Sequence, residues 1–81
     1  MSNFVIRTNK SEPAEYFGGL HYAHEYKEYY PTLETSVEGA KRWKTCKGAE
    51  RNIEKLKHDF AYYLTEAEVE ELWVEEVEDD L

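Results

Sequence analysis

Cysteine, proline, glycine and long apolar runs are all scarce in this chain of 81 residues. The single cysteine, Cys46, cannot close an internal disulfide, which is typical of proteins from the reducing cytosol. No run approaches the ~20 apolar residues that a membrane-spanning helix needs, and the start, MSNFVIRTNK, lacks the apolar core of a secretory signal. We therefore expect a cytoplasmic protein whose residues 1–81 form a single small domain, with 78–81 frayed.

Basic residues are absent from residues 61–81, which carry nine of the eighteen acidic residues. Residues 1–60 hold all ten lysines and arginines, and seven of these lie within 41–57 against only two acids. The chain thus has a near-neutral first part, a basic middle and an acidic end. Such a layout can neutralise itself within the fold or present opposite charges to two partners.

Tyrosine is abundant, and aromatic residues crowd positions 15–30. After Gly18-Gly19 they recur at every second position, which favours a strand or an open hairpin near 16–30 over a helix from 20 to 29. Pro31 is expected to end that element. A short β-branched run predicts another strand near 3–8, and residues 9–13 indicate a turn.

Apolar residues recur at spacings of three and four from Cys46 to Tyr63, which predicts one amphipathic helix over 45–64. Before it, Thr35 or Ser36 is expected to cap a short helical turn. After it, Thr65-Glu66-Ala67-Glu68 matches a capping box, so we expect a helical turn near 66–71 and an edge strand near 72–78, with an all-helical end as the alternative.

The predicted fold class is α+β: a small antiparallel sheet packed against one long amphipathic helix, with an acidic C-terminal strand or helix. The strands are expected near 3–8, 16–30 and 72–78. The predicted core comprises Val5, Tyr22, Val37, Ala40, Trp43, Ala49, Ile53, Leu56, Phe60 and Trp73.

The stretch SVEGAKRWKTCKGAE, residues 36–50, running on to Lys55-Leu56, resembles a recurrent segment of small hypothetical proteins in phages and prophages of Gram-positive bacteria. Those proteins resemble this chain in plan, with an FVIRT-like strand, an aromatic middle, this helix and a closing strand such as WVEEVE. The resemblance covers about half of the chain and carries no catalytic residues. It implies a small accessory protein of a mobile element inside a bacterial host cell. The chain departs from the plan in residues 15–35 and 60–71, where a special function is expected.

Two groups of residues could form a metal site or a reactive thiol. His21, His24, Glu25 and Glu28 could hold zinc, but the two histidines share a face only on a helix and point to opposite sides of a strand. Cys46 lies among lysines that would lower the pKa of its thiol, yet its place on the apolar stripe favours a buried structural cysteine. No nucleophile elbow or phosphate-binding loop occurs, so we expect neither an enzyme nor a cofactor, and a small metal-binding domain stays a second alternative.

The best functional prediction is binding to a protein partner. Rows of carboxylates can imitate phosphates towards a basic groove that normally takes DNA or RNA, and tyrosines supply interface anchors. The resemblance to proteins of mobile elements implies that such a chain acts as an inhibitor of a host nucleic-acid-handling or defence protein, such as a CRISPR-like complex. The predicted partner-binding residues are Glu70, Glu71, Glu75, Glu76, Tyr26, Tyr29 and Tyr30.

The first alternative is an accessory protein that binds nucleic acid through the basic region 41–57. Its residues would be Lys41, Arg42, Lys44, Lys47, Arg51 and Lys55. The pI near 4.8 weighs against it, because dedicated binders usually have a pI above ~9.

Overall fold

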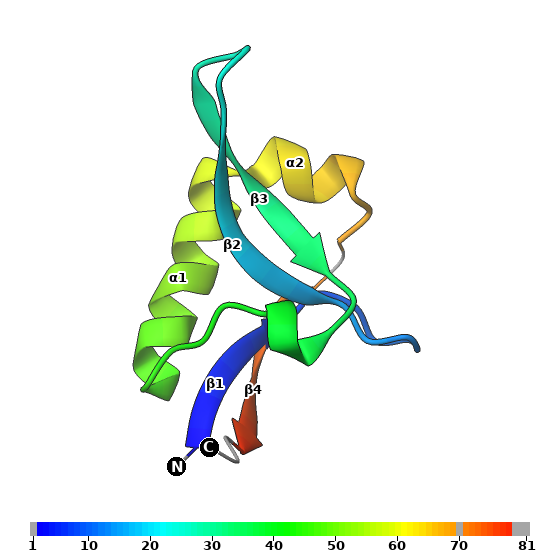
Figure 1. Cartoon of the computed structure of the whole chain (residues 1–81), viewed down its shortest axis with the longest axis vertical. Coiled ribbons are helices and arrows are strands. Elements are labelled where there is room, and N and C mark those ends of the chain that lie inside the picture. Colours follow the sequence, from blue (N-terminus) through cyan, green and yellow to red (C-terminus); the bar gives the residue numbers. More distant parts are fainter. Residues whose placement is uncertain (1, 70, 79–81) are drawn as a thin grey trace.

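The computed structural model describes residues 2–69 and 71–78, which form a four-stranded antiparallel sheet and two α-helices (Figure 1). The α+β class predicted from the sequence is confirmed. The elements follow the chain as β1 (Ser2–Arg7), β2 (Tyr16–Ala23), β3 (Glu28–Glu34), η1 (Val37–Gly39), α1 (Cys46–Asp59), α2 (Ala61–Glu66) and β4 (Trp73–Glu78). The strand order in the sheet is β3-β2-β1-β4, so β3 and β4 occupy opposite edges.

The two central strands, β1 and β2, pair at one end and then diverge. β1 and β2 pair at Arg7 and Tyr16. The segment after η1 then runs between the diverging strands: the Lys41 amide donates to the Phe17 carbonyl at 3.0 Å, and Trp43 exchanges two 2.9 Å backbone hydrogen bonds with Phe4. This segment therefore satisfies backbone groups that the splayed strands would otherwise leave unpaired.

Helix α1 begins where Thr45 accepts a 3.0 Å hydrogen bond from the Gly48 amide. Three positions of the predicted apolar stripe, Ala49, Ile53 and Leu56, are buried against the sheet. The short turn before the helix is a 3-10 turn capped by Ser36, one of the two predicted caps.

Most of the predicted core is confirmed, and one member is wrong. Val5, Ala40 and the three α1 positions are buried, and Val37, Trp43, Phe60 and Trp73 are half-buried. Tyr22 is exposed because the part of the sheet that carries it extends beyond α1. Three buried hydrophobic residues were not predicted, Ile6, Phe17 and Leu72, and neither was the buried polar residue Thr8.

The single helix predicted over 45–64 is wrong, because the chain bends at Phe60. That residue has φ −127° and ψ 29°, ends α1 by donating to the Leu56 carbonyl, and accepts the first bond of α2 from Leu64. Phe60 and Leu64 both pack against the core. The apolar spacing therefore continues through the bend, because both helices pack against the same core.

The capping box predicted at 65–68 is the end of α2 and not the start of a helix. The amides of Glu68 and Val69 donate to the carbonyls of Thr65 and Leu64, and Glu68 has φ 59°. These bonds and the left-handed residue make a Schellman motif. The helical turn expected near 66–71 is thus wrong, whereas the edge strand expected near 72–78 exists as β4, which includes Glu78. The remaining residues predicted as frayed, 79–81, lie outside the described chain.

The aromatic segment 16–30 forms a hairpin of two strands, which excludes the alternative helix. Pro31 does not end β3 but lies within it, opposite Leu20. An edge strand tolerates proline because the missing amide can face away from the sheet. Gly18 and Gly19 form a bulge in β2, where Gly19 adopts φ +115°. The bulge bends the hairpin, since an extra residue increases the local twist of a strand.

Candidate functional site

The outer half of the β2–β3 hairpin extends away from the rest of the molecule, at the end opposite to the free ends of β1 and β4 (Figure 1). Directly paired residues of the two strands lie on the same side of the ribbon, and successive pairs alternate. Tyr22 therefore shares one side with its partner Tyr29, and His21 shares the other side with Tyr30. The ribbon thus has two different aromatic sides.

The side that carries Tyr22 is an exposed apolar surface of Leu20, Tyr22 and Tyr29. Together with the exposed turn residue Tyr26, we call it the tyrosine side. The exposed fractions are 47% for Leu20, 37% for Tyr22, 56% for Tyr29 and 73% for Tyr26. The rings of Tyr22 and Tyr29 contact one another at 5.0 Å between centroids. Of the three tyrosines predicted to bind a partner, Tyr29 lies on this side, Tyr26 lies in the turn and Tyr30 lies on the other side.

The opposite side of the ribbon is tied to α2. The ring of Tyr63 lies 6.4 Å from that of Tyr30, and its hydroxyl donates to Glu28 at 3.1 Å. This bond to Glu28 is the main cause that raises the pKa of the Tyr63 phenol, with desolvation as the second. These contacts hold one side of the hairpin to the helix, whereas no contact with α2 covers Tyr22 or Tyr29 among the described residues.

The structure does not assemble the zinc cluster considered above. His21 packs edge-on against Tyr30, whereas His24 lies in the turn and packs against Tyr22 on the other side of the ribbon. Among the described residues, no group of three or more histidine, cysteine, aspartate or glutamate side chains could hold a metal ion. The physical reason is that strand pairing sets His21 beside Tyr30, whereas the turn places His24 against Tyr22 on the other side.

The predicted glutamates that the structure describes, Glu71, Glu75 and Glu76, lie at the far edge of the sheet from the tyrosines, on β4 or just before it. Glu71 binds Lys10 at 2.7 Å, which lowers the pKa of the Glu71 carboxyl, and Glu75 binds Arg7 at 3.4 Å. Glu70 lies outside the described residues. The acidic and aromatic groups that the sequence suggested as one surface are therefore two separate surfaces, and part of the acidic charge is neutralised within the chain.

Arg7 organises the side of the sheet that turns away from α1. Its guanidinium lies 5.8 Å from the ring centre of Tyr16 and 5.3 Å from that of Trp73, its paired neighbours on either side. It also donates to the Asn9 carbonyl at 2.9 Å and to Glu75. A largely buried arginine with aromatic, carboxylate and carbonyl partners stabilises the sheet, so we assign it a structural role.

The six predicted nucleic-acid contacts also divide into two groups. Lys41 lies over the Trp43 ring at 5.8 Å, and Arg42 donates to the Val37 carbonyl at 3.3 Å, so both serve the connecting segment. Lys44 is exposed there as well. The remaining three, Lys47, Arg51 and Lys55, follow one another at intervals of four residues along the exposed face of α1.

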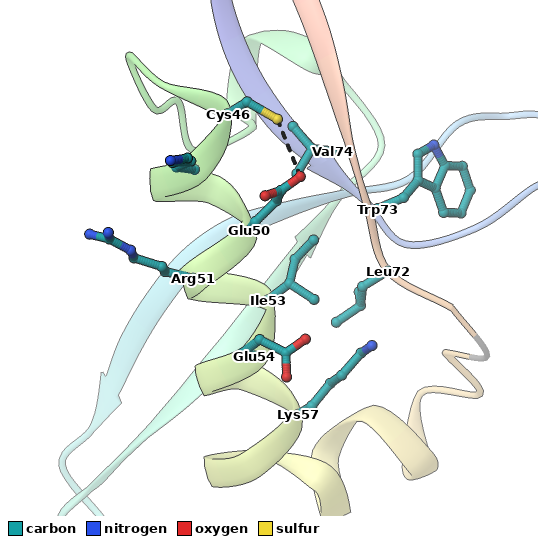
Figure 2. Close-up of a pocket in the computed structure, with 10 residues that line it drawn as sticks. Cys46, Glu50, Arg51, Ile53, Glu54, Lys57, Leu72, Trp73 and Val74 are labelled. Atoms are coloured by element: carbon teal, nitrogen blue, oxygen red, sulfur yellow. Dashed lines mark hydrogen bonds between the residues drawn. The ribbon is translucent and has the colours of Figure 1, made fainter.

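Cys46 opens α1 at the end of a groove between this helix and β4, shown in Figure 2. The favoured expectation of a buried structural cysteine is wrong, and so is the alternative of a thiol whose pKa the nearby lysines lower. The thiol is exposed and donates to Glu50 at 3.5 Å. Desolvation is the largest cause that raises its pKa, followed by the bond and charge of Glu50 and the charge of Glu76. A thiol that is mostly protonated near neutral pH is a poor nucleophile.

In comparisons with known proteins, the chain matches no family model, no curated protein and no solved structure. Within the described residues, no helix has the length and apolar character needed to cross a membrane.

Proposed function

We propose that this protein is a binding module that contacts a protein partner through the tyrosine side of its β2–β3 hairpin. The observation that carries the proposal is the exposure of four large apolar residues on one part of the hairpin. Tyrosine is enriched at the energetic centres of interfaces, because it offers a large rigid ring and a hydroxyl that can stay hydrogen-bonded.

The geometry favours a protein over a nucleic acid as the ligand of this surface. Stacking platforms for single strands lie within positively charged grooves. The hairpin turn instead carries Glu25 beside Lys27, and Glu28 follows at the start of β3. The resemblance to phage and prophage proteins adds the hypothesis that the partner belongs to the bacterial host and is inhibited by the contact.

A comparison of two variants tests the proposal. The first replaces the hairpin contacts, Tyr22→Ser with Tyr29→Ser, and the second replaces an exposed tyrosine of α2, Tyr62→Ser, as the matched control. Both variants and the wild type would be immobilised in parallel, and proteins retained from bacterial lysate identified by mass spectrometry.

We expect a protein that the wild type and the control retain and the hairpin variant loses. With that protein purified, the double substitution should weaken binding by about 2 kcal/mol or more, roughly thirtyfold. Equal retention by all three proteins, with unchanged circular dichroism spectra, would show that the tyrosine side is not the contact.

A second candidate is nucleic-acid binding by α1. It is favoured by the exposed row Lys47, Arg51 and Lys55, none of which forms an ion pair with a described residue. If these residues contact phosphates, the logarithm of the binding constant should fall with the logarithm of salt concentration, with a slope of about −0.9 per phosphate. Replacing all three by glutamate should abolish a gel shift seen at low salt, and absence of any wild-type shift would refute the candidate.

A further inference from the structure

The two edges of the sheet differ in how they could receive another strand. On β3, Pro31 interrupts the row of backbone donors. On β4 no proline occurs, and within the described chain this strand pairs with β1 alone. The edge of β4 therefore carries backbone donors and acceptors that a further strand can use.

A groove runs beside this free edge, between β4 and α1 (Figure 2). Its volume is about 820 Å³. Ile53 and Leu72 point towards one another across it, with Val74 nearby on β4. Ile53 and Leu72 are buried core residues, so the apolar contact that β4 offers to an alternate side chain of an added strand comes from the half-buried Val74.

The charged side chains of β4 determine which side chains an added strand needs. Val74, Glu76 and Glu78 pair with residues of β1 that include the core residue Ile6, so their side chains point to the face that α1 covers. On that face the charge of Glu76 reaches Cys46, whose thiol is bonded to Glu50. The groove itself is lined by Lys47, Arg51 and Lys57 of α1 together with Glu50 and Glu54, so it favours no cation along its length. Cationic side chains fit only opposite Glu76 and Glu78, which lie outside that lining, and an apolar one fits opposite Val74.

Two further observations narrow the choice of partner. Glu75 points to the other face, where Arg7 already neutralises it, so no second basic row is required there. A second copy of this chain is unsuitable, because antiparallel pairing of two β4 strands would set glutamates against glutamates.

From this arrangement we propose that the outer edge of β4 binds an extended basic segment of a partner protein as an antiparallel fifth strand. Read from its N-terminus, the segment carries basic residues at its first and third positions, opposite Glu78 and Glu76, and an apolar residue at its fifth, opposite Val74. This site is separate from the tyrosine side of the hairpin, and either can exist without the other.

The probes are two capped peptides, Lys-Val-Lys-Thr-Val-Thr and its counterpart with glutamate in place of lysine. They are titrated into isotopically labelled protein and followed by the amide NMR signals. We expect saturable shifts of the β4 and β1 amides with the lysine peptide and none with the glutamate peptide. Equal responses to both peptides, or shifts confined to other strands, would overturn the proposal.

Two further peptides test the strand geometry. Each is the lysine peptide with N-methyl groups on alternate residues, placed in the two possible phases. Because only every second amide of an added strand faces β4, one phase should abolish binding and the other should preserve it. Loss of binding in both phases, or in neither, would exclude strand addition.

The charge requirement is tested with Glu76→Gln combined with Glu78→Gln. We expect the lysine peptide to bind about three- to tenfold more weakly. The matched control, Glu12→Gln with Glu66→Gln, removes the same charge from exposed sites elsewhere and should bind as the wild type does. Tyr22→Ser with Tyr29→Ser should also leave peptide binding unchanged, so failure of this proposal is distinguishable from failure of the proposed hairpin contact. Equal affinity for all variants would refute the charge complementarity.

Discussion

The hairpin beyond Gly19 and the part of the molecule built from α1, β1 and β4 use their apolar residues in opposite ways. In the second part Ile6, Ile53 and Leu56 are withdrawn from solvent. In the hairpin Leu20 and three tyrosines remain exposed, and the strands are held by backbone pairing and contacts between rings. Burial supplies most of the free energy of folding in a small domain. The core around α1 therefore stabilises the protein, and the hairpin is free to carry a binding surface.

The sharpest test of this comparison substitutes one residue from each region. Ile53→Ala should lower the free energy of unfolding by about 2–4 kcal/mol, because it opens a cavity between α1 and the sheet. Tyr29→Ala removes an exposed ring and should cost no more than about 1 kcal/mol. Chemical denaturation followed by circular dichroism measures both, and equal effects would contradict the division of roles.

The second test concerns the link between the regions. Gly19→Ala places a side chain at φ +115°, a conformation that residues with a Cβ rarely adopt, and should cost roughly 1–3 kcal/mol. The strain should appear first as lost amide protection in β2 and β3, with the amides of α1 still protected. Hydrogen exchange measured by NMR would reveal it, and uniform loss throughout the protein would mean that the hairpin and core unfold as one unit.

A smaller effect is expected at the free thiol. Because Glu50 contributes both a bond and a charge that raise the pKa of Cys46, Glu50→Gln should lower this pKa towards the ordinary thiol value. The thiolate fraction at pH 8 then rises, and alkylation by iodoacetamide should accelerate by less than about tenfold, since one pKa unit changes that fraction tenfold at most. Glu54→Gln, one helical turn further on, is the control and should leave the rate unchanged.

The smallest effect concerns the bond that ties the hairpin to α2. The pKa of Tyr63 is raised in the folded state, so the bond to Glu28 contributes stability at neutral pH and loses it only as pH rises through that raised value, above about 10. Glu28→Gln should return the Tyr63 titration towards ordinary phenols. Ring signals of Tyr63 in NMR spectra of the wild type and the variant, recorded from pH 9 to 12, would show this.

The local patterns that predicted this structure correctly are those in which one periodicity dominates. Alternating aromatics identified the hairpin strands, and the stripe through Ala49, Ile53 and Leu56 identified α1. The wrong predictions arise where one sequence pattern is compatible with two different structures. The stripe runs through the bend at Phe60 because both helices face the same core, and the sequence Thr65–Glu68 fits a helix start as well as the end that it forms.

The candidate surfaces also separate into features that a local sequence pattern can predict and features that it cannot. Nothing in the spacing of Tyr22, Tyr29 and Tyr30 says which ring α2 will cover, and Tyr22, predicted as core, instead belongs to the exposed surface. A signal for it did exist, since Tyr22 and Tyr29 become paired neighbours once a four-residue turn is placed at 24–27. The open edge of β4 had no such signal, because strand order depends on contacts between distant parts of the chain.

The sequence by itself determined the α+β class, the hairpin, the amphipathic α1 and the separation of basic from acidic segments, because these follow from short-range periodicity and composition. Only the tertiary structure decided that Arg7 and Lys10 would neutralise Glu75 and Glu71, and that the tyrosines and glutamates would lie at opposite edges of the sheet. Such pairings join residues far apart in the chain, and their free energies depend on a burial and geometry that no local pattern contains.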